Sequence, residues 1–587
     1  MKKLNGVSAS PGIVIGKLFF YQGNEFYDIP RYAVGKTQVD SEWRRFLAAI
    51  EATAEDVRAL HDKAARETSK EKADIFQAHL MMLEDPEFRN QIKERLGADR
   101  ENIEWIVWDI SREIVSKMMS SPDAYLRERA VDIADVSHRI MHKLLGIKEF
   151  SLADLTEDVI LVAHDLLPSE VLTMNKDRVK GILTDMGGPT SHTAILARAF
   201  GIPAVLGLSA VTREINAGDI LVVDGNAGQV IINPNKNTLV KYQDAIKQYR
   251  RKRDKLLSTV DFPAETKDGH RVILKANIEI PEEAEQVLRY GAEGIGLYRS
   301  EFLYLTPGQA AEEERQYHAY STVLKAMGNL PVTIRTLDVG GDKVSPNIPS
   351  SDDKNPLLGW RAIRMCLAMP DLFKTQLRAI LRASVHGNVK IMFPMISGVE
   401  ELEQVLLLLE EAKAECLQKK QRFSKEIEVG TMIEIPSAAL TADVLACKSD
   451  FFSLGTNDLL QYILAVDRGN EKVNYLAQPF HPAMLRTLKL TIDAAHARGI
   501  KAAMCGELAG VTSVTPILLG LGLDEFSMAA AAIPMVKQII RGTTIEDCRI
   551  LAEKAMVSIS YKQIDALVNA WMAEHFPNNR RAGCNGI

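Results

Sequence analysis

Eight short apolar segments alternate with helical segments in the second half of the chain, and this pattern constrains the fold most. The alternation starts after about residue 268 and runs almost to the C-terminus. In order, the segments are RVILKANI, GIGLYRS, VTIRTLDVGG, VKIMFPMI, VGTMIEIPSA, FFSLGTND, KAAMCGE and LDEFSMA. Eight βα units over roughly 300 residues predict a TIM (β/α)8 barrel, in which parallel strands close into a cylinder covered by helices.

Polar residues gather where these strands end. Barrel enzymes place their chemistry at the C-terminal ends of the strands, so these residues are candidates for a site. They are Arg299, Glu301, Arg335, Asp338, Lys343, Arg361, Glu434, Asn457, Asp458, Arg468, Cys505 and Glu507. Four of them are arginines, which favour an anionic substrate because guanidinium groups match phosphate and carboxylate bidentately.

Two acids, Glu434 and Asp458, follow neighbouring strands of the predicted barrel. Mg²⁺ is held by one or two carboxylates and completes its shell with water and substrate oxygens, so the pair suits this metal. Other interpretations stay open, since arginines and acids on a barrel also form plain ion pairs. A single cysteine such as Cys505 can equally be a small buried hydrophobic residue. Because all of these residues are expected at the same end of the barrel, a functional site is favoured over unrelated ion pairs.

The part of the chain before the barrel has a different pattern. Apolar residues recur at helical spacing over 39–64, 70–84, 102–119 and 126–145, which predicts a small helical bundle. From residue 157 short β-branched runs end in Gly, Asp or Pro and indicate an α/β body. The charged segment 238–257 reads as an exposed connector helix.

One histidine stands at the start of a predicted helix in the segment GGPTSHTAILARAFGIPAV, residues 187–205. Thr190 or Ser191 can cap this helix, which places His192 in its first turn. Free amide groups and the positive end of a helix favour an anion there, so a phosphoryl group carried on the imidazole would be stabilised. An ordinary first-turn histidine is the alternative.

Composition excludes several classes of protein. A chain of 587 residues is too long for one core, and a net charge of −6 provides no general attraction for nucleic acid or anionic lipid. The N-terminus makes a poor signal sequence, and no apolar run reaches membrane-spanning length. Six scattered cysteines without a CxxC pair favour reduced thiols, so we expect a cytoplasmic protein.

The two candidate sites complement each other. One body offers a histidine nucleophile whose product is an anion, and the barrel offers a cationic pocket ready for a metal. Together they suggest phosphoryl transfer through a covalent phosphohistidine.

The chain resembles enzyme I of the bacterial sugar phosphotransferase system, the phosphoenolpyruvate–protein phosphotransferase family, essentially from end to end. The motifs that carry the resemblance are GVSASPGIVIGKLF, ADIFQAHLMMLEDPEF, GGPTSHTAILAR, GAEGIGLYRSEFLY, RTLDVGGDK, NPLLGWRAIR, ILRAS, IMFPMI, FFSLGTNDLLQYILAVDRGN, MCGELAG and LGLGLDEFSMA. The chain differs from the usual family pattern at Pro189, Val511 and Met535, none of which is a candidate catalytic residue.

The resemblance implies a role for each candidate residue. His192 is expected to take the phosphoryl group from phosphoenolpyruvate and pass it to a histidine of the carrier protein HPr or a paralogue. The expected substrate ligands are Arg299, Arg335, Arg361, Asn457, Asp458 and Arg468. Glu434 and Asp458 resemble the Mg²⁺ ligands, and Cys505 resembles the acid that protonates the enolate carbon as pyruvate forms. Burial would keep that thiol protonated.

The expected domain organisation combines the pattern with the resemblance. Residues 1–20 and 147–233 form a swivelling phosphohistidine α/β domain, and residues 21–146 form an inserted helical domain that docks the carrier. A linker helix spans 234–262. Residues 263–575 form the TIM barrel that binds phosphoenolpyruvate and, in relatives, makes the homodimer, and 576–587 form a tail.

Two other functions stay open. An enzyme like pyruvate phosphate dikinase or phosphoenolpyruvate synthase shares the histidine motif and the barrel, but it needs an ATP-binding domain. The residues before the histidine domain contain no GxxxxGK[ST] run and no stretch long enough for such a module. The second alternative is a regulatory paralogue that docks a carrier protein without turning over phosphoenolpyruvate.

Overall fold

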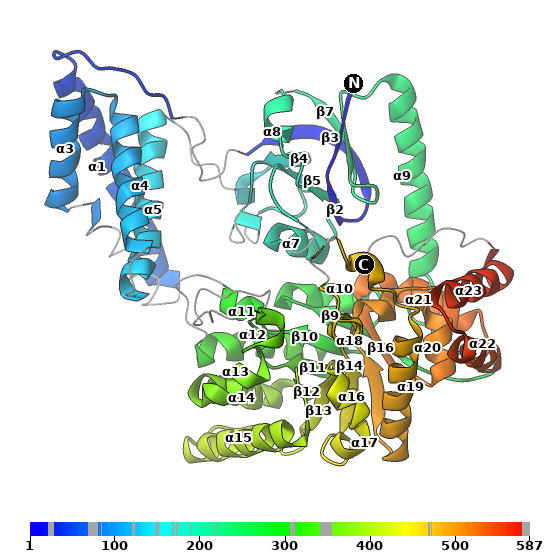
Figure 1. Cartoon of the computed structure of the whole chain (residues 1–587). Coiled ribbons are helices and arrows are strands. Elements are labelled where there is room, and N and C mark those ends of the chain that lie inside the picture. Colours follow the sequence, from blue (N-terminus) through cyan, green and yellow to red (C-terminus); the bar gives the residue numbers. More distant parts are fainter. Residues whose placement is uncertain are drawn as a thin grey trace. The chain divides into compact units, whose positions relative to one another are not determined.

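The computed structural model of the chain divides into two compact units, Met1–Ile246 and Lys247–Ile587 (Figure 1). It describes residues 1–21, 29–67, 80, 82–83, 85–119, 124–146, 152–166, 170–171, 174–188, 191–216, 218–305, 312–340, 355–467, 470 and 472–577. The boundary between the units falls inside the long helix α9 (Lys236–Leu257), the segment expected to connect two bodies.

Long helices form a bundle in the first unit. They are α1 (Val39–Glu67), α3 (Pro86–Asp99), α4 (Ile103–Met119) and α5 (Ala124–Leu145). The stripe expected on the first of them is buried, with Phe46, Ile50 and Val57 in the bundle core. The sequence pattern did not predict α3, because only Ile92 and Leu96 of its side chains are buried and the helix therefore has little periodicity. The predicted helix 70–84 lies largely outside the described residues.

An eight-stranded sheet forms the α/β body of the first unit. Its strands are β1 (Lys2–Asn5), β2 (Val7–Ser10), β3 (Ile13–Phe20), β4 (Val159–Ala163), β5 (Val179–Thr184), β6 (Ala204–Leu206), β7 (Ile220–Asp224) and β8 (Gln229–Ile232). They are ordered β1-β8-β7-β3-β4-β5-β6-β2, and the pairs from β3 to β6 are parallel. Strands from the start of the chain thus share one sheet with strands that follow the bundle. The shorter helices of this body are α7 (His192–Phe200) and α8 (Val211–Glu214).

Eight parallel strands close into a barrel in the second unit, as the sequence predicts. They are β9 (Ile273–Ile278), β10 (Ile295–Arg299), β11 (Val332–Arg335), β12 (Val389–Phe393), β13 (Glu428–Ile433), β14 (Phe451–Leu454), β15 (Lys501–Met504) and β16 (Glu525–Ala529). Each strand pairs with the next in parallel, and β16 closes onto β9 with Phe526 opposite Leu274. All eight predicted strand segments are confirmed.

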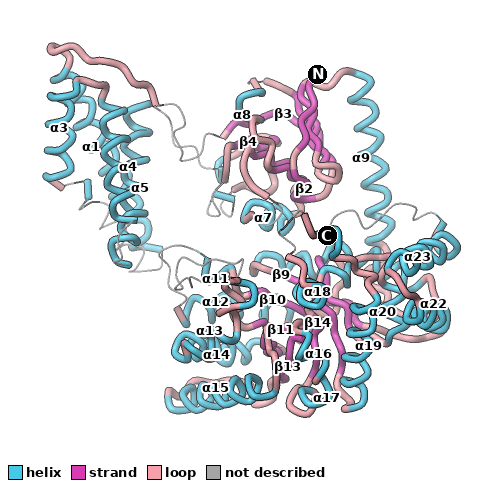
Figure 2. The backbone as a smooth tube through the Cα atoms, in the orientation of Figure 1, coloured by secondary structure: helices cyan, strands magenta, loops and turns pink. Residues whose placement is uncertain are grey.

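Helices surround the barrel strands, as the colouring by secondary structure makes visible (Figure 2). They are α10 (Ala284–Arg289), α11 (Phe302–Leu305), α12 (Glu313–Met327), α13 (Ile363–Ala368), α14 (Pro370–Ala383), α15 (Val399–Gln418), α16 (Pro436–Leu440), α17 (Ala442–Leu445), α18 (Thr456–Leu464), α19 (Pro482–Ala497), α20 (Thr515–Leu521), α21 (Ile533–Arg541), α22 (Ile545–Val557) and α23 (Tyr561–His575).

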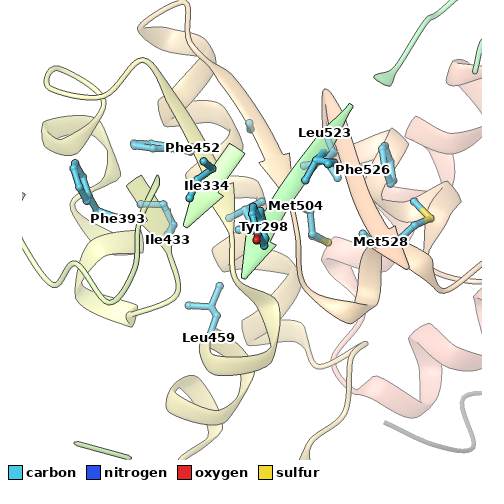
Figure 3. Close-up of a cluster of buried hydrophobic side chains, with 14 of the residues drawn as sticks. Tyr298, Ile334, Phe393, Ile433, Phe452, Leu459, Met504, Leu523, Phe526 and Met528 are labelled. Carbon is cyan, nitrogen blue, oxygen red and sulfur yellow. The ribbon is translucent and has the colours of Figure 1, made fainter. Parts of the chain in front are cut away.

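Large side chains from many strands fill the core of this unit. Tyr298, Phe393, Phe452 and Phe526 are among its largest fully buried residues (Figure 3). Because each strand is buried on both faces, its sequence reads as a nearly continuous apolar run, which made the strands recognisable. Among the helices that the structure describes, none is long and apolar enough to cross a membrane.

Candidate active site

His192 is the first residue of α7, and Ser191 is its N-cap. The Ser191 hydroxyl accepts a hydrogen bond from the Ala194 amide at 3.3 Å, so Ser191, one of the two predicted capping residues, caps this helix. His192 therefore stands in the first helical turn, where amide groups without intrahelical partners favour an anion. Its side chain lies outside the described part of the structure, as do Pro189 and Thr190.

A second histidine, His164, lies at the carboxyl end of β4, the strand that pairs with β5. His164 Nδ1 is 3.2 Å from the buried carboxylate of Asp185, which follows β5. The same carboxylate accepts a hydrogen bond from the Thr212 amide at 3.3 Å. The first turn of α7 is tied to this segment, because Thr193 Oγ1 donates to the Leu166 carbonyl at 3.3 Å. His164 and Asp185 are not among the residues singled out from the sequence, although polar residues that follow two parallel strands were a usable signal.

The arginines of the barrel are linked by acids into an alternating series of charges. Arg335 pairs with Glu301 and lies 3.2 Å from Asp338, and Arg361 donates to the other oxygen of Asp338 at 2.9 Å. Arg361 also lies 3.6 Å from Asp458. Burial by itself would lower the pKa of Arg335, but the charges of Glu301 and Asp338 outweigh this effect and raise it. Both arginines are thus held charged in a buried setting.

Backbone geometry around Arg361 is adapted to its burial. Its side chain has 0% exposure, and Gly340 approaches so closely that a Cβ there would lie 2.6 Å from the Arg361 Cβ. Gly340 has a φ of 106° and Ala362 a φ of 51°, both in the left-handed region. Such conformations cost free energy for residues other than glycine and cluster at functional sites. Among the described atoms, Nε of both Arg335 and Arg361 is buried without a hydrogen-bond partner, which suits an anionic ligand.

The two acids expected to hold a metal are both buried in this region. Glu434 accepts a hydrogen bond from the Met395 amide at 2.7 Å, and Met395 has a φ of 57°. Burial raises the pKa of Glu434 well above its usual value, and the neighbouring charge of Asp458 raises it further. Asp458 Oδ1 is buried and has no hydrogen-bond partner among the described atoms. A divalent cation would offset both features, so the residues fit Mg²⁺.

Cys505 directly follows β15 and belongs to a buried cluster in the barrel with Leu297, Met392, Met432 and Phe451. Its side chain is 3% exposed, and burial raises the pKa of the thiol to about 11. Cys505 is thus a small buried residue, and the arginines do form ion pairs, as the alternative interpretations expected. Neither feature conflicts with a functional role, because a buried thiol stays protonated and paired arginines stay charged.

Other candidate residues occupy the same rim. Asn457 and Glu507 exchange two hydrogen bonds of 3.2 and 3.1 Å, which join the first turn of α18 to the segment after β15. Arg299 is about one-third exposed and pairs with Glu279, which follows β9. Arg468 and Lys343 lie outside the described residues. No group of three or more His, Cys, Asp or Glu side chains with metal-binding geometry occurs among the described residues, so the metal proposal rests on two carboxylates.

Models of three domains match the chain. Residues 253–545 match the PEP-binding domain of PEP-utilising enzymes, residues 5–129 their N-terminal domain and residues 155–228 their mobile domain. A solution NMR structure of an Enzyme I protein shares 43% sequence identity, covers 42% of this chain and 99% of that one, and gives a TM-score of 0.33.

Curated relatives match nearly the whole chain. A phosphoenolpyruvate-protein phosphotransferase of Priestia megaterium is 44% identical over 92% of this chain and 94% of its own length. The protein of that name from Bacillus subtilis (strain 168) is 43% identical over 97% of this chain and 99% of its own. The resemblance inferred from the motifs is confirmed, and the chain belongs to the phosphoenolpyruvate-protein phosphotransferase family.

Proposed function

We propose that this chain transfers the phosphoryl group of phosphoenolpyruvate to His192, releases pyruvate, and passes the group to a histidine of the carrier protein HPr or a paralogue. One observation carries the proposal within the structure. In the barrel, a buried series of alternating arginines and acids ends at Glu434 and Asp458, the two carboxylates that fit Mg²⁺. The protonated thiol of Cys505 lies beside them. These are the groups that phosphoryl transfer and the following protonation need.

In this proposal the cationic groups bind phosphoenolpyruvate. Arg299, Arg335 and Arg361 contact the anionic oxygens, together with Asn457 and Arg468. A loose phosphoryl-transfer transition state spreads negative charge over the phosphoryl oxygens, so fixed positive charges stabilise it. Because Asp338 and Glu301 already hold two of the guanidinium groups, little reorganisation is needed when the substrate binds.

Glu434 and Asp458 would hold Mg²⁺, and Asp458 would also face the substrate. The ion, when bound, would neutralise charge on the phosphate and orient it. The protein groups do the remaining work: the arginines bind, His192 attacks phosphorus through an imidazole nitrogen, and the enolate of pyruvate leaves. Cys505 then gives its thiol proton to C3 of the enolate, and the thiolate is reprotonated from solvent.

We also propose that the protein acts in the cytoplasm as a homodimer, with no nucleic acid or membrane partner. The net charge of −6 supports the lack of a nucleic-acid or anionic-lipid partner. The homodimer is what the family resemblance implies. Sedimentation of the purified chain over a range of concentrations tests the dimer directly, and a mass of a single chain throughout would contradict it.

Incubation of the purified chain with ³²P-phosphoenolpyruvate and Mg²⁺ tests the function, first alone and then with each candidate carrier protein. We expect label on the chain, followed by its transfer to a carrier, without added nucleotide. A requirement for ATP or inorganic phosphate would favour a dikinase-like enzyme. A chain that binds a carrier but takes no label would favour the regulatory alternative.

A further inference from the structure

Asn277 makes a side-chain hydrogen bond to the backbone of the proposed proton donor. It lies at the carboxyl end of β9, and its Nδ2 donates to the carbonyl oxygen of Cys505 at 2.9 Å. On its other side, Ser527 Oγ donates to Asn277 Oδ1 at 2.6 Å. The three residues come from three adjoining segments of the barrel, β9, β16 and the end of β15.

The orientation of the Asn277 amide follows from its two partners. A carbonyl oxygen can only accept a hydrogen bond, so the NH₂ group of Asn277 must face Cys505. Its oxygen then faces Ser527, whose hydroxyl can donate. Ser527 is 1% exposed, and Gly296 leaves the space that it occupies, because a Cβ at 296 would lie 2.4 Å from Ser527 Oγ. Gly296 thus leaves room for the hydroxyl, and the hydrogen bond from that hydroxyl holds the amide in one orientation.

Cys505 needs this contact because it stands beyond the regular strand. Strands β15 and β16 pair only at Ala503 and Met504, so no ladder bond from β16 reaches Cys505. On the other side, the Cys505 amide donates to the Leu454 carbonyl at 3.2 Å. The Asn277 side chain supplies the second anchor, and the peptide that carries the thiol is fixed from both sides.

We propose that Asn277 is a positioning residue that aims the Cys505 thiol at C3 of the enolate formed when phosphoenolpyruvate loses its phosphoryl group. This inference rests on the proposed function. The enolate takes a proton on C3 from sulfur, the S–H bond breaks as the C–H bond forms, and the thiolate regains a proton from solvent. Asn277 does not touch the reacting atoms, and it acts through the backbone of Cys505.

The variant Asn277→Asp tests this role with almost no change in size. The carboxylate can still accept from Ser527, but it cannot donate to the Cys505 carbonyl. Ser527→Ala is the second variant, which keeps the donor but removes the group that orients it. Asn569→Ala is a matched control, because Asn569 donates to Asp565 on the exposed surface of α23.

The measurement separates phosphoryl transfer from protonation. Phosphoenolpyruvate with deuterium at one C3 position is turned over in tritiated water, and the chirality of the pyruvate methyl group is determined. The first-turnover rate of ³²P labelling is measured in parallel. In the unmodified enzyme and in Asn569→Ala we expect protonation of C3 from one face.

In Asn277→Asp we expect ³²P labelling within about twofold of the unmodified rate, together with a large loss of methyl chirality. A displaced thiol lets the enol escape and take its proton from water on both faces, since a misplacement of about 1 Å can slow a step by roughly 100-fold. Ser527→Ala should show a smaller loss in the same direction. Full chirality in both variants would overturn the inference, and so would an equal loss of labelling and chirality. If the unmodified chain takes no label, the proposed function itself is wrong.

Discussion

The Asp338 carboxylate bridges two arginines inside the barrel. Its Oδ1 accepts a hydrogen bond from Arg361 Nη2 at 2.9 Å, and its Oδ2 lies 3.2 Å from Arg335 Nη2. Both Asp338 and Arg361 have 0% exposure. One buried acid therefore sets the spacing of the two guanidinium groups that we assign to the phosphate.

Asp338→Asn should weaken this arrangement while nearly preserving its shape. Removing one partner of a buried ion pair leaves uncompensated charge and destabilises a protein by about 3–5 kcal/mol. We expect a lower free energy of unfolding in urea and a raised KM for phosphoenolpyruvate. Asp493→Asn, which breaks an exposed pair with Lys489, is the control and should change neither quantity appreciably. If the free energy of unfolding and the KM both equal those of the unmodified chain, the role of Asp338 is contradicted.

Gly455→Ala should disturb the proposed metal site. A Cβ at 455 would lie 2.6 Å from Glu434 Oε2, whereas the φ of −85° at this position is allowed for alanine. The effect should therefore come from displacing Glu434, and we expect a markedly higher Mg²⁺ concentration for half-maximal activity. Gly97→Ala serves as a control, because its Cβ would meet nothing within 4 Å. An unchanged Mg²⁺ titration in Gly455→Ala would refute the assignment of Glu434.

The Cys505 thiol should resist alkylation at mildly alkaline pH. With a pKa raised to about 11, roughly one thiol in a thousand is ionised at pH 8, whereas about a quarter would be for a free cysteine of pKa about 8.5. Only the thiolate reacts with iodoacetamide, so we expect the exposed Cys447 to be modified before Cys505. Peptide mapping by mass spectrometry checks the order, and early modification of Cys505 would speak against its protonated state.

His192→Ala should abolish labelling by ³²P-phosphoenolpyruvate, because the variant lacks the nucleophile that we propose. In the unmodified chain, the label should be lost in acid and kept in alkali, as expected for a phosphorus–nitrogen bond. His270→Ala, a change near the start of the barrel, is the control and should label normally. Normal labelling of His192→Ala would disprove the assignment.

The barrel and the main helices could be predicted because their signals are local. Each barrel strand carries an apolar run that can be read within a few residues, and the burial of Phe46, Ile50 and Val57 follows from helical spacing. The capping of α7 was also predictable to within one residue, because Ser191 adjoins the helix start. Helix α3 was not predicted, because few of its side chains are buried and its sequence therefore shows little apolar periodicity.

The sequence by itself determined the family, the eight strands of the barrel and the polar residues that follow several of them. Only the tertiary structure decided which of those residues meet, because contacts such as Asn277 with Cys505 or Arg361 with Asp458 join positions far apart along the chain. The physical reason is closure of the barrel. It brings the ends of all eight strands to one rim and removes their charges from water, and burial then sets both the partners and the pKa of each group.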